Sequence, residues 1–121
     1  MFLFFNDMYM FIAAVLEDES AARGTAATIT CTISGLSENT PVVWIDPDNN
    51  EISESDTENY VINQGTYVFF SKASTLKIEQ SKLDTLPSSS TFKCQLKSAQ
   101  YPTYSPNVVK EMRLTLLDLS N

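Results

Sequence analysis

The chain contains two cysteines, Cys31 and Cys94, and one tryptophan, Trp44, each inside a short stretch typical of a β-strand. An indole between two widely spaced cysteines is the pattern of a two-sheet sandwich that is cross-linked through its core. Two cysteines leave two possibilities, a pair of reduced thiols or one disulfide, and the strand context must decide between them. This pattern constrains the architecture more than any other feature of the chain.

The composition fits one domain and excludes several functions. A chain of 121 residues has room for one core of ordinary size. Its 8 Lys and Arg residues stand against 15 Asp and Glu, for a net charge of −7, which repels nucleic-acid backbones and anionic membrane surfaces. We therefore expect no nucleic-acid partner and no membrane contact within residues 15–119.

The sequence contains no histidine, which removes most catalytic and zinc-binding arrangements. Ser-His-Asp and Cys-His catalysis need an imidazole that titrates near neutral pH, and so do most zinc sites outside the all-cysteine kind. Asp46, Asp48 and Asn50 match the first ligand spacings of a calcium loop, but Glu51 stands where that loop needs glycine. We expect a solvated turn there, no metal, no cofactor, no catalytic residues and hence no enzyme.

Residues 1–14 form an apolar N-terminal segment (MFLFFNDMYMFIAA). The uninterrupted apolar run from Met8 to Leu16 is too short for a transmembrane helix, which needs about 20 residues. No lysine or arginine precedes it, as one would in an ordinary secretory signal. An atypical signal peptide and the stub of a preceding domain or linker both remain open, and we expect the folded domain over residues 15–119.

From residue 15 onward, turns separate short stretches with strand patterns. Residues 27–34 alternate apolar side chains with threonine, which is the period of a half-buried antiparallel strand. Further strand-like stretches cover residues 41–45, 59–63, 74–79, 91–98 and 108–117. The strongly apolar residues 67–70 are expected to start a strand or to cap the core. With about seven strands and no helical pattern, the sequence predicts an all-β, two-sheet antiparallel sandwich.

Cys31 and Cys94 fall on inward positions in the middle of strands that such a sandwich places in opposite sheets. The sheets of a sandwich pack about 10 Å apart, which brings inward cysteines within bonding range. The pattern therefore predicts one inter-sheet disulfide, with Trp44, Leu76 and Phe92 in the core around it. A disulfide indicates an oxidising compartment, so we expect an extracellular or cell-surface location.

The chain resembles a domain of the immunoglobulin superfamily over residues 15–119. The residues that carry the resemblance are Gly24-Thr25-Ala26-Ala27-Thr28-Ile29-Thr30-Cys31, Val43-Trp44, Ser74-Thr75-Leu76-Lys77-Ile78 and Phe92-Lys93-Cys94. The short distance between Trp44 and Leu76 favours a constant-like or intermediate set over a variable set, which has two more strands.

The family usually carries tyrosine where Phe92 stands, and its hydroxyl bonds the preceding connection. Without that bond we expect a looser connection over residues 81–90. Asp84 is the counterpart of the acidic residue that the family carries there.

The resemblance implies pairing with another immunoglobulin-like domain through the sheet whose inward residues include Trp44, Cys94 and Leu114. The candidate protein-binding residues on its outer face are Val43, Ile45, Lys93, Gln95, Lys97, Val109 and Arg113. Aliphatic residues within a basic frame suit recognition of another protein, and an ordinary surface with scattered apolar residues is the alternative. A second candidate is the proline-braced loop with Tyr101 and Tyr104, whose tyrosines otherwise support the loop itself.

These patterns predict a non-catalytic extracellular recognition or adhesion module that binds another protein. We expect it in a cell-surface receptor or a secreted recognition protein. The alternative is a structural spacer in a multi-domain extracellular chain, and the oligomeric state is left open.

Overall fold

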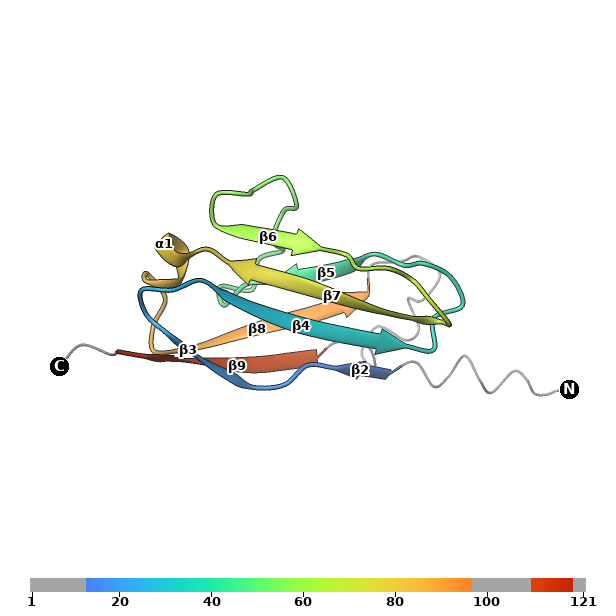
Figure 1. Cartoon of the computed structure of the whole chain (residues 1–121), viewed down its shortest axis with the longest axis horizontal. Coiled ribbons are helices and arrows are strands. Elements are labelled where there is room, and N and C mark those ends of the chain that lie inside the picture. The colour runs from blue at the N-terminus through green and yellow to red at the C-terminus, as the bar shows by residue number, and fades with distance from the viewer. Residues whose placement is uncertain (1–12, 97–109, 119–121) are drawn as a thin grey trace, which may run out of the picture.

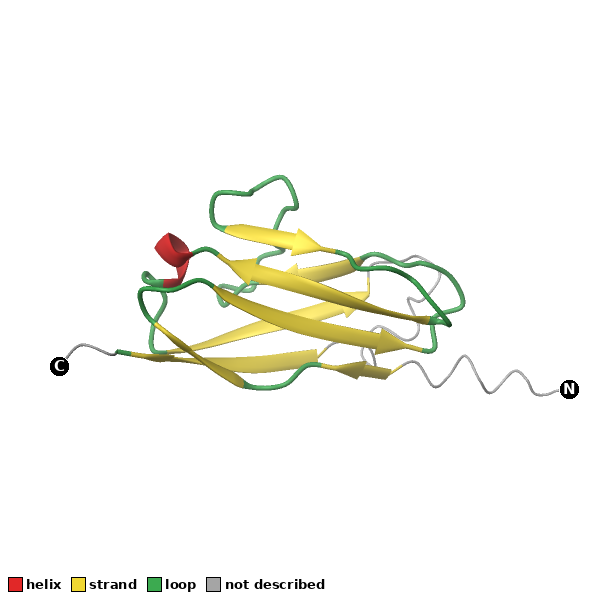
Figure 2. Ribbon diagram, viewed as in Figure 1, coloured by secondary structure: helices red, strands yellow, loops and turns green. Residues whose placement is uncertain are grey.

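The computed structural model describes residues 13–96 and 110–118 of the chain. Two four-stranded sheets, with strand orders β2-β4-β7-β6 and β3-β9-β8-β5, pack face to face (Figure 1). Figure 2 shows that strands form nearly all of the regular structure, with one short helix at one end. The elements are β2 (Ala13–Val15), β3 (Glu19–Ala22), β4 (Ala27–Ser34), β5 (Val42–Ile45), β6 (Tyr60–Asn63), β7 (Ser71–Ile78), α1 (Gln80–Leu83), β8 (Ser89–Leu96) and β9 (Lys110–Leu117).

The first strand is divided between the two sheets. β2 pairs antiparallel with β4, and the chain then crosses to the other sheet, where β3 runs parallel to β9. The described part therefore has eight strands and one parallel pair, where the sequence predicts about seven antiparallel strands. β2 already includes Ala13 and Ala14, and Ala14 is buried, so the sandwich begins before the predicted start at residue 15.

Strict alternation along the long strands fills the space between the sheets. β4 buries Ile29, Cys31 and Ile33 and turns its threonines outward, and β7, β8 and β9 alternate in the same way. A disulfide joins Cys31 to Cys94 across the two sheets, with their Cα atoms 6.5 Å apart. The predicted all-β sandwich and its inter-sheet disulfide are thus confirmed.

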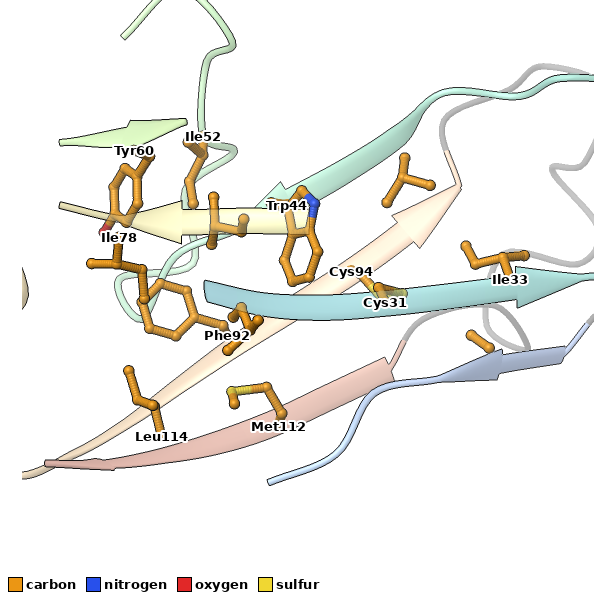
Figure 3. Packing of buried hydrophobic residues seen from close by; sticks show 14 of the residues in the cluster. Cys31, Ile33, Trp44, Ile52, Tyr60, Ile78, Phe92, Cys94, Met112 and Leu114 are labelled. Atoms are coloured by element: carbon orange, nitrogen blue, oxygen red, sulfur yellow. A yellow bond between two sulfur atoms is a disulfide. The ribbon is translucent and has the colours of Figure 1, made fainter. Parts of the chain in front are cut away.

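Three large side chains surround the disulfide. Trp44, Leu76 and Phe92 are all fully buried, and Figure 3 shows Trp44 beside the sulfur atoms. The indole Nε1–H of Trp44 donates to Ser74 Oγ at 3.0 Å. This bond satisfies the polar group of the largest core residue, as a buried indole requires.

The connection between β7 and β8 differs from the prediction. It contains α1, a single helical turn that is too short to show a helical period in the sequence, and its Leu83 and Leu86 are buried. Asp84 Oδ1 accepts the N–H of Gly24 at 2.9 Å, and the Asp84 carbonyl accepts Arg23 Nη1 at 3.3 Å. The connection is therefore anchored at several points. The sequence analysis expects a looser segment here, because the tyrosine hydroxyl of the family is missing.

Within the described ranges, no helix has the length and apolar character to cross a membrane.

Candidate protein-binding surfaces

The outer face of the β3-β9-β8-β5 sheet holds the first predicted surface. The strand register places Val43 opposite Gln95 and Ile45 opposite Lys93. Ile45, Lys93 and Gln95 are half-buried, and Arg113 on β9 is exposed. Among the described residues, no helix or strand packs on this face (Figure 1).

The charges on this face are of both signs, whereas the sequence analysis expects basic residues around the aliphatic ones. Glu111 lies directly opposite Lys93, and Asp18 Oδ1 accepts the backbone N–H of Arg113 at 2.7 Å. Lys93 Nζ also donates to Asn49 Oδ1 at 2.9 Å. The alternation of β9 already places Glu111 on the same face as Arg113, so the sequence held the signal for this carboxylate.

Val43 differs from the prediction because it is only 8% exposed. It lines a depression of about 380 Å³ between the edge strands β5 and β6, which we call the β5–β6 pocket. The other lining residues are Pro41, Val42, Glu51, Ile52, Ser53, Glu54 and Ile62. Val43 therefore belongs to a concave edge of the sandwich and adds little to an exposed patch on the sheet.

The backbone along the free edge of β5 is already hydrogen-bonded. Gln64 acts as a substitute strand, because its Oε1 accepts the N–H of Val42 and its Nε2 donates to the Val42 carbonyl, both at 2.8 Å. Next along the edge, the N–H of Ile52 donates to the Trp44 carbonyl at 2.8 Å. These bonds leave little on this edge for an added strand, which protects against edge-to-edge pairing.

The second predicted surface, the loop with Tyr101 and Tyr104, lies outside the described residues, as do Lys97 and Val109. The described chain stops at Leu96 and resumes at Lys110. The role of these four residues stays a prediction.

The two most exposed large apolar residues of the described chain, Phe69 and Phe70, lie in a turn that the sequence analysis misplaces. Val68 is 50%, Phe69 90% and Phe70 64% exposed. They neither cap the core nor start a strand, since β7 begins at Ser71. The residues that usually mark a hairpin turn are absent here, so sequence reasoning had no signal for it.

Val68–Ser71, which we call the aromatic turn, is a tight two-residue hairpin. The N–H of Val68 donates to the Ser71 carbonyl at 2.9 Å, and the N–H of Ser71 to the Val68 carbonyl at 3.1 Å. Phe69 and Phe70 have φ angles of 52° and 64°. Positive φ at both central residues defines a type I′ turn, for which Asn-Gly is strongly preferred, and it costs a bulky residue about 1 kcal/mol or more.

The aromatic turn rests on a buried residue, Leu36, of the loop between β4 and β5. The N–H of Leu36 donates to the Phe70 carbonyl at 2.9 Å, and the hydroxyl of Tyr67 donates to the Leu36 carbonyl at 2.6 Å. Leu36 is fully buried. The turn is therefore tied to the core on both sides of its exposed rings.

A buried lysine lies directly after the aromatic turn. Lys72 is 4% exposed, and its Nζ donates to Asn39 Oδ1, the Thr40 carbonyl and Gln64 Oε1 at 3.0–3.1 Å. Burial lowers the pKa of Lys72, and the carboxylate of Glu54 acts in the opposite direction. The ammonium links β7 to the loop before β5 and to Gln64.

At the opposite end, Tyr60 lines a depression together with Asp46, Pro47 and Asp48. Burial raises the pKa of Tyr60, and the carboxylates of Asp46, Asp48 and Asp56 act in the same direction. Its hydroxyl has no hydrogen-bond partner among the described residues, while its ring packs edge-on against Phe92 with 6.2 Å between centroids.

Asp46 uses its carboxylate within its own turn. Its Oδ1 accepts the N–H groups of Asp48 and Asn50, both at 2.9 Å. In the described part of the chain, no group of three or more Asp, Glu, Cys or His side chains is placed to hold a metal ion.

No protein-family model and no curated protein matches the chain. Among solved structures, the Ig1 domain of mouse SynCAM 2 superposes with a TM-score of 0.63 at 13% identity, covering 89% of this chain and 98% of that one. The M1 domain of titin gives a TM-score of 0.57 at 14% identity, covering 90% and 95%. The structure of the Dpr1 IG1 domain bound to the DIP-eta IG1 domain gives 0.57 at 15% identity, covering 89% and 93%.

These likenesses extend over almost the whole length of single immunoglobulin domains, at identities that carry information about the fold alone. They agree with the two sheets, the inter-sheet disulfide and the tryptophan packed beside it. The chain is therefore an immunoglobulin-like domain in its fold.

Proposed function

We propose that the domain is a non-catalytic recognition module that binds another protein outside the cell. The observation that carries the proposal is the open sheet face around Ile45, a half-buried aliphatic residue paired with Lys93. An apolar centre within a polar and charged rim is how recognition surfaces are built. The alternating charges of Lys93, Glu111 and Arg113 would select and orient a partner of complementary pattern.

Three further observations support this proposal. The disulfide favours an oxidising compartment, since cytosolic thiols are normally kept reduced. The absence of histidine disfavours the common catalytic arrangements. The Dpr1 IG1 domain, which has a similar fold, is bound to a second Ig domain, and we therefore take another immunoglobulin-like domain as the partner class.

The test is a binding screen with matched variants. Fluorescent tetramers of the disulfide-bonded domain are applied to an array of other immunoglobulin-like ectodomains. We expect Ile45→Glu to abolish any specific binding without lowering the melting temperature. Val61→Glu, which places the same charge on exposed β6 of the other sheet, is expected to leave binding intact.

Equal loss in both variants, or no loss in Ile45→Glu, would assign binding to another surface. Unfolding of Ile45→Glu would contradict the outward facing of this residue. A domain that binds no ectodomain of the array behaves as a spacer.

A further inference from the structure

The aromatic turn is a prominent exposed feature that the proposed function leaves unused. Six large apolar residues of the described chain are exposed, and three of them, Val68, Phe69 and Phe70, are consecutive. The other three are scattered singly over the surface, which is ordinary for a soluble domain. Exposed aromatic residues gathered at one projecting turn indicate a contact with another molecule.

The backbone holds these rings in place against local preference. Two phenylalanines occupy left-handed positions, and hydrogen bonds from Leu36 and Tyr67 fix the turn on the core. Backbone strain of this kind persists where the surrounding structure over-determines it, and it concentrates at functional sites. A turn whose backbone is already fixed loses less conformational entropy on binding, and aromatic side chains are typical of interface hot spots.

The same chain offers a complementary receptor for such a ring. The β5–β6 pocket has aliphatic walls from Val42, Val43, Ile52 and Ile62, and its volume of about 380 Å³ accommodates one aromatic side chain. The backbone beside it is satisfied by Gln64, so an incoming strand finds few partners there. A phenyl ring needs no hydrogen bond and suits the aliphatic walls, while Glu51, Ser53 and Glu54 form the polar part of the lining.

We propose that the aromatic turn of one copy of this domain docks into the β5–β6 pocket of a second copy. One turn in one pocket buries far less than the roughly 1,200 Å² of a stable interface, so the association is weak and gains strength where many copies face each other. The net charge of −7 opposes the encounter, and added salt screens this repulsion. Self-association that strengthens with salt is therefore the signature of this contact.

Sedimentation equilibrium of the disulfide-bonded chain, up to millimolar concentration and at ionic strengths of about 0.1 M and 1 M, tests the proposal. We expect the association constant to rise with salt. Phe69→Asn should lower it by about tenfold or more, because asparagine tolerates the left-handed turn but removes the ring. Thermal unfolding verifies that each variant remains folded.

Two matched variants distinguish this contact from nonspecific association. Ser53 lies at the exposed rim of the pocket, and Ser53→Arg reduces the net negative charge of the domain. If charge repulsion alone controlled association, this variant would associate more strongly. We expect it to associate more weakly, because the arginine side chain obstructs the pocket. Leu117→Ser removes an exposed apolar side chain at the far end of β9 and should leave the association constant unchanged.

A wild-type chain that stays monomeric at both ionic strengths overturns the proposal, as does undiminished association in Phe69→Asn or Ser53→Arg. Binding of the wild type, but not of Phe69→Asn, to neutral phosphatidylcholine vesicles without self-association would assign the turn to a lipid surface instead. Ile45→Glu should not alter this self-association, so the turn and the sheet face can fail independently.

Discussion

The two ends of the sandwich differ in which residues occupy left-handed backbone positions and in which side chains are exposed. At the end with α1, left-handed positions belong to Gly24 and Asn49, the apolar Leu83 and Leu86 are buried, and the exposed Asp84 carboxylate accepts a backbone N–H. At the end with the aromatic turn, two phenylalanines with exposed rings take left-handed positions in addition to Gly35 and Gly65, while the ammonium of Lys72 is buried.

Both ends share the same core and disulfide. Forming the fold therefore does not by itself account for the difference between the two ends. Apart from the unpartnered Tyr60 hydroxyl, the end with α1 follows the usual turn chemistry and burial, and such agreement is how a sequence specifies a stable structure. The end with the aromatic turn departs from these rules at adjacent positions and compensates with hydrogen bonds. Departures of this kind are expected at binding sites, and we interpret the contrast as one end that stabilises and one that binds.

The largest expected effect comes from two of the three glycines with positive φ, Gly65 and Gly24. At Gly65, with φ of 77°, an added Cβ would collide with the backbone carbonyl of Ala73, so Gly65→Ala should lower the free energy of unfolding by about 3 kcal/mol or more. At Gly24, with φ of 87°, the space is open, and Gly24→Ala should lower it by only about 1 kcal/mol. Urea denaturation measures both, and equal losses would contradict the tight packing of the chain before the aromatic turn.

Next in size is the removal of a polar anchor from each end. Lys72→Met leaves Asn39, Thr40 and Gln64 without the ammonium that they share and should lower the free energy of unfolding by about 2 kcal/mol. Asp84→Ala removes an exposed hydrogen bond to Gly24 and should lower it by about 1 kcal/mol or less. A Lys72→Met variant as stable as the wild type would show that the buried ammonium contributes nothing to this end.

The smallest effect at neutral pH is expected for Tyr60→Phe, because the hydroxyl has no partner among the described residues. The pKa of Tyr60 is raised in the folded state, so the unfolded chain loses this proton first as the pH rises. Stability of the wild type should therefore fall above about pH 10, by up to about 1.4 kcal/mol per pH unit from this group. Tyr60→Phe should fall less steeply there, and parallel curves would contradict the burial of the hydroxyl.

The part of the fold that follows from periodicity could be predicted from the sequence. Alternation places Ile29, Cys31 and Ile33 inward on β4, and the spacing of the two cysteines and Trp44 selects the sandwich. The split first strand could not be predicted, because three or four residues are too few to show which sheet they join. The single turn of α1 could not be predicted either, because it is too short to show a helical period.

The candidate surfaces were predictable only where side-chain alternation decides them. Ile45, Lys93 and Gln95 lie where alternation places them, but the burial of Val43 depends on residues 51–54, whose position no local pattern encodes. The aromatic turn was unpredictable because Phe69 and Phe70 contradict the usual turn chemistry, so propensity favours a strand or a core position.

The contrast between the two ends depends most directly on whether the phenylalanines of the aromatic turn lower the free energy of unfolding. Replacing both rings by the preferred type I′ pair, in Phe69→Asn/Phe70→Gly, tests this by urea denaturation at neutral pH. We predict that the free energy of unfolding rises by about 1 kcal/mol, because the left-handed strain is relieved while the hydrogen bonds of Val68 and Ser71 remain. A variant less stable than the wild type would show that the phenylalanines support the fold, and would contradict the assignment of this end to binding.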